Sequence, residues 1–145
     1  MSEYARPIKA LGEVVLRVRN LDAMQEFYAG VVGLELLERF ENMMAFFRIA
    51  TDYEGHTQSL ALFDQTGEAD HRSRHYTGVD PEKSPLHHIA FTISLSDYEA
   101  EKVRLRNLGL DVETAEHTWE HYRSLYIADP EGNVVEFVCY DASVL

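Results

Sequence analysis

LHHIAFTI, residues 86–93, has a counterpart in LGEVVLRV, residues 11–18, about 75 positions earlier in the chain. Both stretches are rich in apolar and β-branched residues, which is typical of strands. Each half of the chain also closes with a short apolar strand, at 59–63 in the first half and 134–138 in the second. The repetition predicts that two modules of one fold follow each other along the chain.

The segments between these strands repeat as well. Each opening strand leads into apolar residues at helical spacing that stop at a glycine, Gly33 or Gly109, and glycine suits a helix end because it adopts the left-handed conformation at no steric cost. The Asp22–Gln25 and Ser96–Glu99 pairs resemble capping boxes that would start the two helices. The predicted strands are 13–19, 34–41, 43–50, 58–63, 86–95, 110–115, 122–128 and 133–140, and the second helix is 97–108.

Each half is therefore expected to run strand, helix, strand, strand, strand, which makes an α+β protein. Two such βαβββ modules, side by side, would form a curved eight-stranded mixed sheet with helices outside and a central cavity. At 145 residues the chain is expected to be a single domain. Module one would cover about 11–64, a polar linker about 65–85 and module two about 86–140.

The repeat also aligns side chains that could form a site. The same offset pairs Glu13 with His88 and Ala61 with Glu136, so four equivalent positions hold three potential metal ligands and one alanine. Because side chains alternate along a strand, Glu13, His88 and Glu136 can all point into the same hollow. His87 is sent to the opposite face, where packing or solvent exposure is expected. Ionised groups within apolar strands need partners, and a divalent cation would supply one.

Composition excludes several classes of function. The net charge of −12 argues against a nucleic-acid partner. Cys139 is the one cysteine in the sequence, so neither an intrachain disulfide nor a thiolate cluster is expected, and it is predicted to lie in the core. The polar start, residues 1–9, lacks the apolar core of a signal peptide, and no run reaches the length of a membrane span. We expect a cytoplasmic protein that does not bind membranes.

Several motifs together resemble the vicinal oxygen chelate superfamily, which includes glyoxalase I, bleomycin-resistance proteins, fosfomycin-resistance enzymes and extradiol dioxygenases. The motifs are the doubled module, a histidine opening the second module and a glutamate that follows Asp129–Asn133 (DPEGN). Leu16–Leu21 (LRVRNL) and Val32–Leu34 are also sequence motifs typical of this family. The resemblance covers residues 11–140 and implies the fold above, a small-molecule substrate and a homodimer.

The resemblance further implies a metal at Glu13, His88 and Glu136, with Ala61 at a fourth position that some members leave without a ligand. Members with three ligands usually have His, His and Glu, so Glu13 is a departure that favours harder, oxygen-loving ions. The ion would be divalent, and the sequence does not distinguish Fe²⁺, Mn²⁺, Zn²⁺ and Ni²⁺. It would leave coordination positions open for water or for a substrate bound through two adjacent oxygens.

Two further spacings resemble the extradiol dioxygenase branch. His117 and Tyr126 stand nineteen and ten residues before Glu136, where that branch has a histidine and a tyrosine lining the substrate pocket. These two are the expected catalytic residues, for proton transfer or hydrogen bonding. Against this branch, Gln58 stands where many of its enzymes have another histidine. Ring-cleavage chemistry is the first expectation, and a glyoxalase-type lyase or isomerase and a metal-free small-molecule binding protein remain open.

Overall fold

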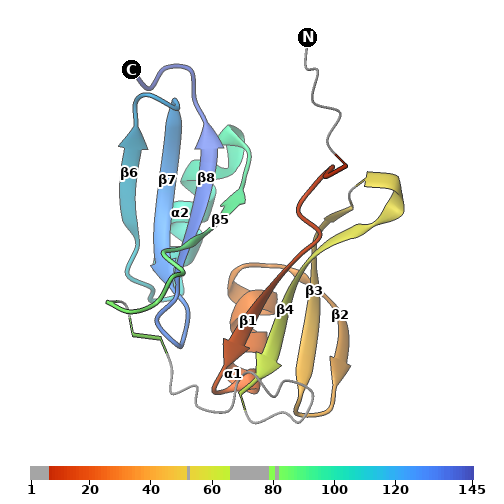
Figure 1. Cartoon of the computed structure of the whole chain (residues 1–145). Coiled ribbons are helices and arrows are strands. Elements are labelled where there is room, and N and C mark those ends of the chain that lie inside the picture. The colour runs from red at the N-terminus through yellow and green to blue at the C-terminus, as the bar shows by residue number, and fades with distance from the viewer. Residues whose placement is uncertain (1–6, 52, 66–78, 81) are drawn as a thin grey trace. The chain divides into compact units, whose positions relative to one another are not determined.

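The computed structural model describes residues 7–51, 53–65, 79–80 and 82–145. The chain divides into two compact units, Met1–Gly78 and Val79–Leu145 (Figure 1). Most of the predicted linker, residues 66–78 and 81, lies outside the described residues. Within the described part of the chain, no helix is long and apolar enough to cross a membrane.

The first unit is a four-stranded mixed sheet with one helix. The strands lie in the order β1-β4-β3-β2, with β1 parallel to β4 and the other neighbours antiparallel. Helix α1 packs against β3 and β4 and continues into a wider π-helical turn. The elements are β1 (Glu13–Val18), α1 (Leu21–Glu26), the π-helical turn (Phe27–Val31), β2 (Glu35–Phe40), β3 (Met44–Thr51) and β4 (Thr57–Asp64).

The sequence pattern of β1 shows how the sheet divides its two faces. Leu16 and Val18 are buried, whereas Glu13, Val15 and Arg17 are exposed. This alternation is the predicted one, since every second side chain of a strand shares a face. The apolar row packs into the core, and the row with Glu13 forms an open face of the sheet.

Helix α1 begins differently from the prediction. Its N-cap is Asn20, whose side chain accepts a hydrogen bond from the backbone N–H of Ala23 at 3.0 Å. The predicted capping box is wrong because both of its side chains bind Arg39 of β2 instead. Arg39 donates to Asp22 at 2.9 Å and to Gln25 at 2.7 Å. A tertiary contact has thus replaced a local one.

The second unit repeats this architecture. Its strands lie in the order β5-β8-β7-β6, with β5 parallel to β8 and the other neighbours antiparallel. Figure 1 shows α2 against one face of this sheet. The two units together confirm the predicted βαβββ order and the α+β class. The elements are β5 (Ile89–Thr92), a 3₁₀ turn (Leu95–Asp97), α2 (Tyr98–Asn107), β6 (Glu113–His117), β7 (Tyr122–Ala128) and β8 (Val134–Tyr140).

Helix α2 stops where the sequence predicts. Gly109 has φ +82°, and its N–H donates to the carbonyl of Arg106, while the N–H of Leu110 donates to the carbonyl of Leu105. This pair of bonds is a Schellman motif, which favours glycine at its left-handed position. The capping box predicted at the other end is wrong, because α2 begins at Tyr98 after a 3₁₀ turn and has no side-chain cap.

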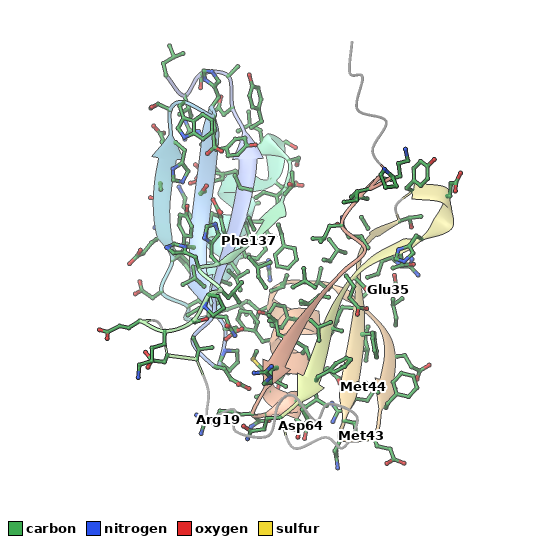
Figure 2. All side chains as sticks on the ribbon, in the orientation of Figure 1. Arg19, Glu35, Met43, Met44, Asp64 and Phe137 are labelled. Atoms are coloured by element: carbon green, nitrogen blue, oxygen red, sulfur yellow. The ribbon has the colours of Figure 1, made fainter. Side chains whose placement is uncertain are left out.

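The two faces of the second sheet differ in chemistry. Leu125, Val135, Phe137 and Cys139 are buried on the face that α2 covers, which confirms the core position expected for the cysteine. Phe137 is labelled in Figure 2 on β8. The opposite face carries Ser124, Tyr126 and Glu136, as well as residues of β5 and β6. The α2 face supplies the hydrophobic core, and the opposite face supplies the polar side chains.

Candidate metal and substrate site

Strand register brings predicted site residues together on the open face of the second sheet. Tyr126 of β7 is the cross-strand partner of Glu136 of β8, and Ala90 of β5 is paired with Glu136 on its other side. His88 precedes the first residue of β5 and shares the face of Ala90 by alternation. His117 is the last residue of β6. Glu136 therefore lies at the centre of this group.

The Glu136 carboxylate is almost fully buried, with 6% of the residue exposed. Its Oε1 accepts hydrogen bonds from the Ser124 hydroxyl at 2.5 Å and the Tyr126 hydroxyl at 3.1 Å. Its Oε2 lies 3.0 Å from His88 Nε2. A buried charge needs such partners, because removing it from water without compensation is very costly. The partners hold the carboxylate in one orientation.

His117 extends this network by one residue. Its Nε2 lies 2.8 Å from the Tyr126 hydroxyl. A phenol has a single proton, and Tyr126 donates it to Glu136, so His117 Nε2 carries the hydrogen and donates to the phenol oxygen. Burial raises the pKa of Tyr126 above its usual value, and the negative charge of Glu136 adds to the rise. Tyr126 therefore remains a neutral hydrogen-bond donor.

His88 has contacts at both ring nitrogens. Its Nε2 lies beside Glu136, and its Nδ1 lies 2.7 Å from Nδ1 of His87. One of these two Nδ1 atoms carries the hydrogen of that contact. His87 is exposed, as expected, and its ring lies edge to face against the ring of His88.

Glu13 belongs to the first unit. It opens β1 on the open face, and its Oε2 accepts a hydrogen bond from the Ser59 hydroxyl at 2.9 Å. Ser59 is its register partner in β4, and Ala61, two residues further, is fully buried on the same face. The contribution of Glu13 to a metal site shared with His88 and Glu136 remains a prediction.

The chemistry of the His88–Glu136 pair fits a divalent ion. Imidazole nitrogen and carboxylate oxygen bind such ions at roughly 2.0–2.2 Å. Two donors 3.0 Å apart, as here, have the spacing of neighbouring ligands around one ion. Among the residues that the structure describes, no group of three histidine, cysteine, aspartate or glutamate side chains forms a metal cluster. In the described part of the second unit, His88 and Glu136 are a pair that could hold an ion.

Ser124 is the one member of the network that the sequence reasoning missed. It is fully buried in β7, and its hydroxyl makes the shortest contact to Glu136. Its position could have indicated it, because it stands two residues before Tyr126 and so shares its face of the strand. A serine that lies between His117 and Tyr126 in the sequence, on the same strand face as Tyr126, could therefore have been proposed as a site residue.

Sequence comparison gives a curated relative with a known reaction. The chain is 33% identical over 132 residues to biphenyl-2,3-diol 1,2-dioxygenase 3 of Rhodococcus globerulus, and the match covers 87% of this chain. It covers 60% of the relative, so the chain spans less than two thirds of that enzyme's length.

Solved structures with the same fold include members with other activities. Lactoylglutathione lyase from Agrobacterium tumefaciens is 27% identical, with a TM-score of 0.62 and coverage of 92% of this chain and 96% of that one. A glyoxalase/dioxygenase from Nostoc punctiforme shares the fold at 22% identity, with a TM-score of 0.69 and coverage of 97% and 99%.

The sequence profile of one family matches nearly the whole chain. The glyoxalase/bleomycin resistance protein/dioxygenase superfamily matches residues 10–137, which span both units and all eight strands as far as Phe137 in β8. This agrees with the doubled βαβββ module and with the relatives above. The chain therefore belongs to the glyoxalase/bleomycin resistance protein/dioxygenase superfamily.

Proposed function

We propose that this protein is a metal-dependent enzyme that binds a small aromatic diol through its two adjacent oxygens and cleaves the ring, as extradiol dioxygenases do. The observation that carries the proposal is the linked network of His117, Tyr126, Glu136 and His88 on one face of one sheet. The 33% identity to a biphenyl-diol dioxygenase supports the same chemistry.

In this proposal His88 Nε2 and Glu136 Oε2 hold the metal, and Glu13 is the third ligand. Two carboxylates and one imidazole favour Mn²⁺ or Fe²⁺ over softer ions. When bound, such an ion supplies Lewis-acid stabilisation of the ionised diol and, as iron, a route for electrons to oxygen. The third ligand is assigned through the repeat, since Glu13 aligns with His88.

Tyr126 and His117 would act on the substrate side of the site. The raised pKa of Tyr126 keeps its hydroxyl protonated, so it can turn its single proton from Glu136 to a substrate oxygen when a substrate binds. His117 Nε2–H donates to the phenol oxygen at 2.8 Å, which polarises the phenol and strengthens it as a donor. His117 would also fix the direction of that hydroxyl.

A glyoxalase-type lyase or isomerase is the second candidate. It is favoured by the 27% identity to a lactoylglutathione lyase across nearly the whole chain. The same residues would then hold a divalent ion that stabilises an enolate of the substrate.

Activity measurements separate the two candidates. Protein loaded anaerobically with Fe²⁺ or Mn²⁺ is mixed with biphenyl-2,3-diol and with simple catechols, and oxygen uptake is followed with ring-cleavage absorbance. The lyase assay uses the adduct of glutathione and methylglyoxal with Zn²⁺ or Ni²⁺. We expect oxygen uptake with a diol, lost in Glu136→Gln and kept in the surface control Glu99→Gln. Turnover of the thiol adduct without oxygen uptake would overturn the dioxygenase proposal in favour of the lyase.

A further inference from the structure

Ser124 occupies an unusual position for a polar side chain. It is fully buried in the middle of β7, and its cross-strand partners are Ala115 of β6 and Val138 of β8. A hydroxyl in such surroundings needs a hydrogen-bond partner. Its proton goes to Oε1 of Glu136 at 2.5 Å, the short distance typical of a hydroxyl bonded to a charged oxygen. The single hydroxyl proton of Ser124 is therefore used in the hydrogen bond to Glu136.

The two oxygens of that carboxylate have different surroundings. Oε1 accepts from Ser124 and from Tyr126. An ionised carboxylate oxygen has about two lone-pair directions, so these two donors use the acceptor capacity of Oε1. Oε2 instead lies beside His88 Nε2, at 3.0 Å. The oxygen next to the imidazole is the one that remains for an ion.

We propose that Ser124 is a positioning residue that makes Glu136 a one-oxygen ligand through Oε2. This inference rests on the proposed function, since it concerns the same metal site. Without the hydroxyl, Oε1 keeps only the longer bond from Tyr126, and the carboxylate can turn or bind an ion through both oxygens. Hydrogen-bond partners that orient metal ligands typically contribute 10–100-fold to metal affinity. Ser124 acts through Glu136 and has no direct role in the reaction.

The test compares Mn²⁺ binding by the full chain and its variants, without substrate. Ser124→Ala is expected to weaken Mn²⁺ binding by about 10–100-fold in a calorimetric titration. Ser124→Thr keeps the hydroxyl and is expected to restore most of the affinity. Ser96→Ala changes an exposed serine before α2 and is expected to leave Mn²⁺ binding unchanged.

A second readout reports the coordination itself. The visible spectrum of bound Co²⁺ depends on ligand number and geometry, and it is expected to change in Ser124→Ala and to return in Ser124→Thr. A merely structural role for the serine would leave this spectrum unaltered in folded protein. Near-UV circular dichroism checks the fold of each variant. If the alanine variant does not fold, Ser124→Cys, with a similar shape and a weaker donor, is expected to show the loss of affinity.

The outcomes separate this inference from the function beneath it. Wild-type affinity and an unchanged Co²⁺ spectrum in folded Ser124→Ala, or in Ser124→Cys where that variant is needed, would overturn the role of Ser124 and leave the metal site standing. Failure of the wild-type protein to bind Mn²⁺ and Co²⁺ would overturn the proposed metal site, and the inference with it.

Discussion

At the residue scale, Glu136 is the centre of the hydrogen-bond network in the second unit. The sequence could predict this glutamate and His88, because the repeat aligns them with Ala61 and Glu13. It could also predict that Tyr126 shares the site. The bonds between these side chains could not be predicted, since they depend on the register of β7 against β8, which the pattern of one strand does not specify. Ser124 was missed although it stands two residues before Tyr126 and so shares its face of the strand.

Tyr126 gives a prediction at this scale. Tyr126→Phe keeps the ring and removes the proton donor, so turnover of a diol is expected to fall by at least about 100-fold, with a smaller effect on Mn²⁺ binding. Because burial raises the pKa of Tyr126, the wild-type phenol should ionise only above pH 10, its ordinary value. Ultraviolet titration of the wild type minus the variant measures this. A difference signal centred below pH 10 would contradict the assignment.

At the element scale, strand and helix order follows from the apolar pattern and from glycines that suit helix ends. The first capping box failed because Asp22 and Gln25 bind Arg39, a residue far along the chain, and no local rule contains that contact. The strand predicted at 86–95 is shorter, Ile89–Thr92, and β6 begins at Glu113 and not at 110. Boundaries depend on pairing with neighbouring strands, whereas the existence of an element depends on its own residues.

The turn between β7 and β8 is an element whose contribution can be measured. Asp129 is buried and accepts hydrogen bonds from the N–H groups of Glu131 and Asn133 and from the Asn133 side chain, at 2.9, 3.0 and 2.7 Å. Asp129→Ala is expected to lower the free energy of unfolding by about 2–3 kcal/mol, as measured by urea denaturation. Asp111→Ala, at an exposed aspartate, is the control. Equal stability of the two variants would show that the turn does not depend on this carboxylate.

The segment after β8 gives a prediction about pH. Hydrogen bonds from the side chain and backbone of Ser143, and the nearby Arg123, lower the pKa of Asp141 from 3.8 to about 2. A carboxyl with a lowered folded-state pKa stabilises the fold above its unfolded value, and this stability is lost as the pH falls from 3.8 through about 2. Unfolding free energies measured between pH 5 and pH 2 should fall less steeply in Asp141→Asn. Parallel pH curves for the wild type and the variant would refute the role of this carboxyl.

At the scale of the whole molecule, the sequence predicts that the two modules share one metal site. Glu13 belongs to one compact unit, and His88 and Glu136 belong to the other. The site would therefore couple the units, within one chain or between two chains of a homodimer. The alignment of the modules could be predicted because the repeat spans both of them. That the two modules share one ion stays a prediction.

Hydrogen exchange tests this coupling. Mn²⁺ is expected to slow amide exchange in β1 as well as in β5 and β8, and Glu13→Ala should remove the protection of β1, because an ion held by both units stabilises both. Glu54→Ala, at an exposed glutamate elsewhere in the first unit, is the control. Because the resemblance implies a homodimer, light scattering should give a mass of twice the 16.6 kDa of one chain. Protection confined to the second unit would show that Glu13 is not a ligand.

Direct measurement of metal binding tests the central claim, that His88 and Glu136 hold a divalent ion. Wild-type protein stripped of metal is titrated with Mn²⁺ and Fe²⁺ by anaerobic calorimetry, beside His88→Ala and Glu136→Gln. We predict one ion per chain in the wild type and a loss of affinity of more than about 100-fold in each variant, beyond the range for residues that only orient a ligand. Wild-type protein that binds neither ion, or variants that bind as the wild type does, would contradict the account.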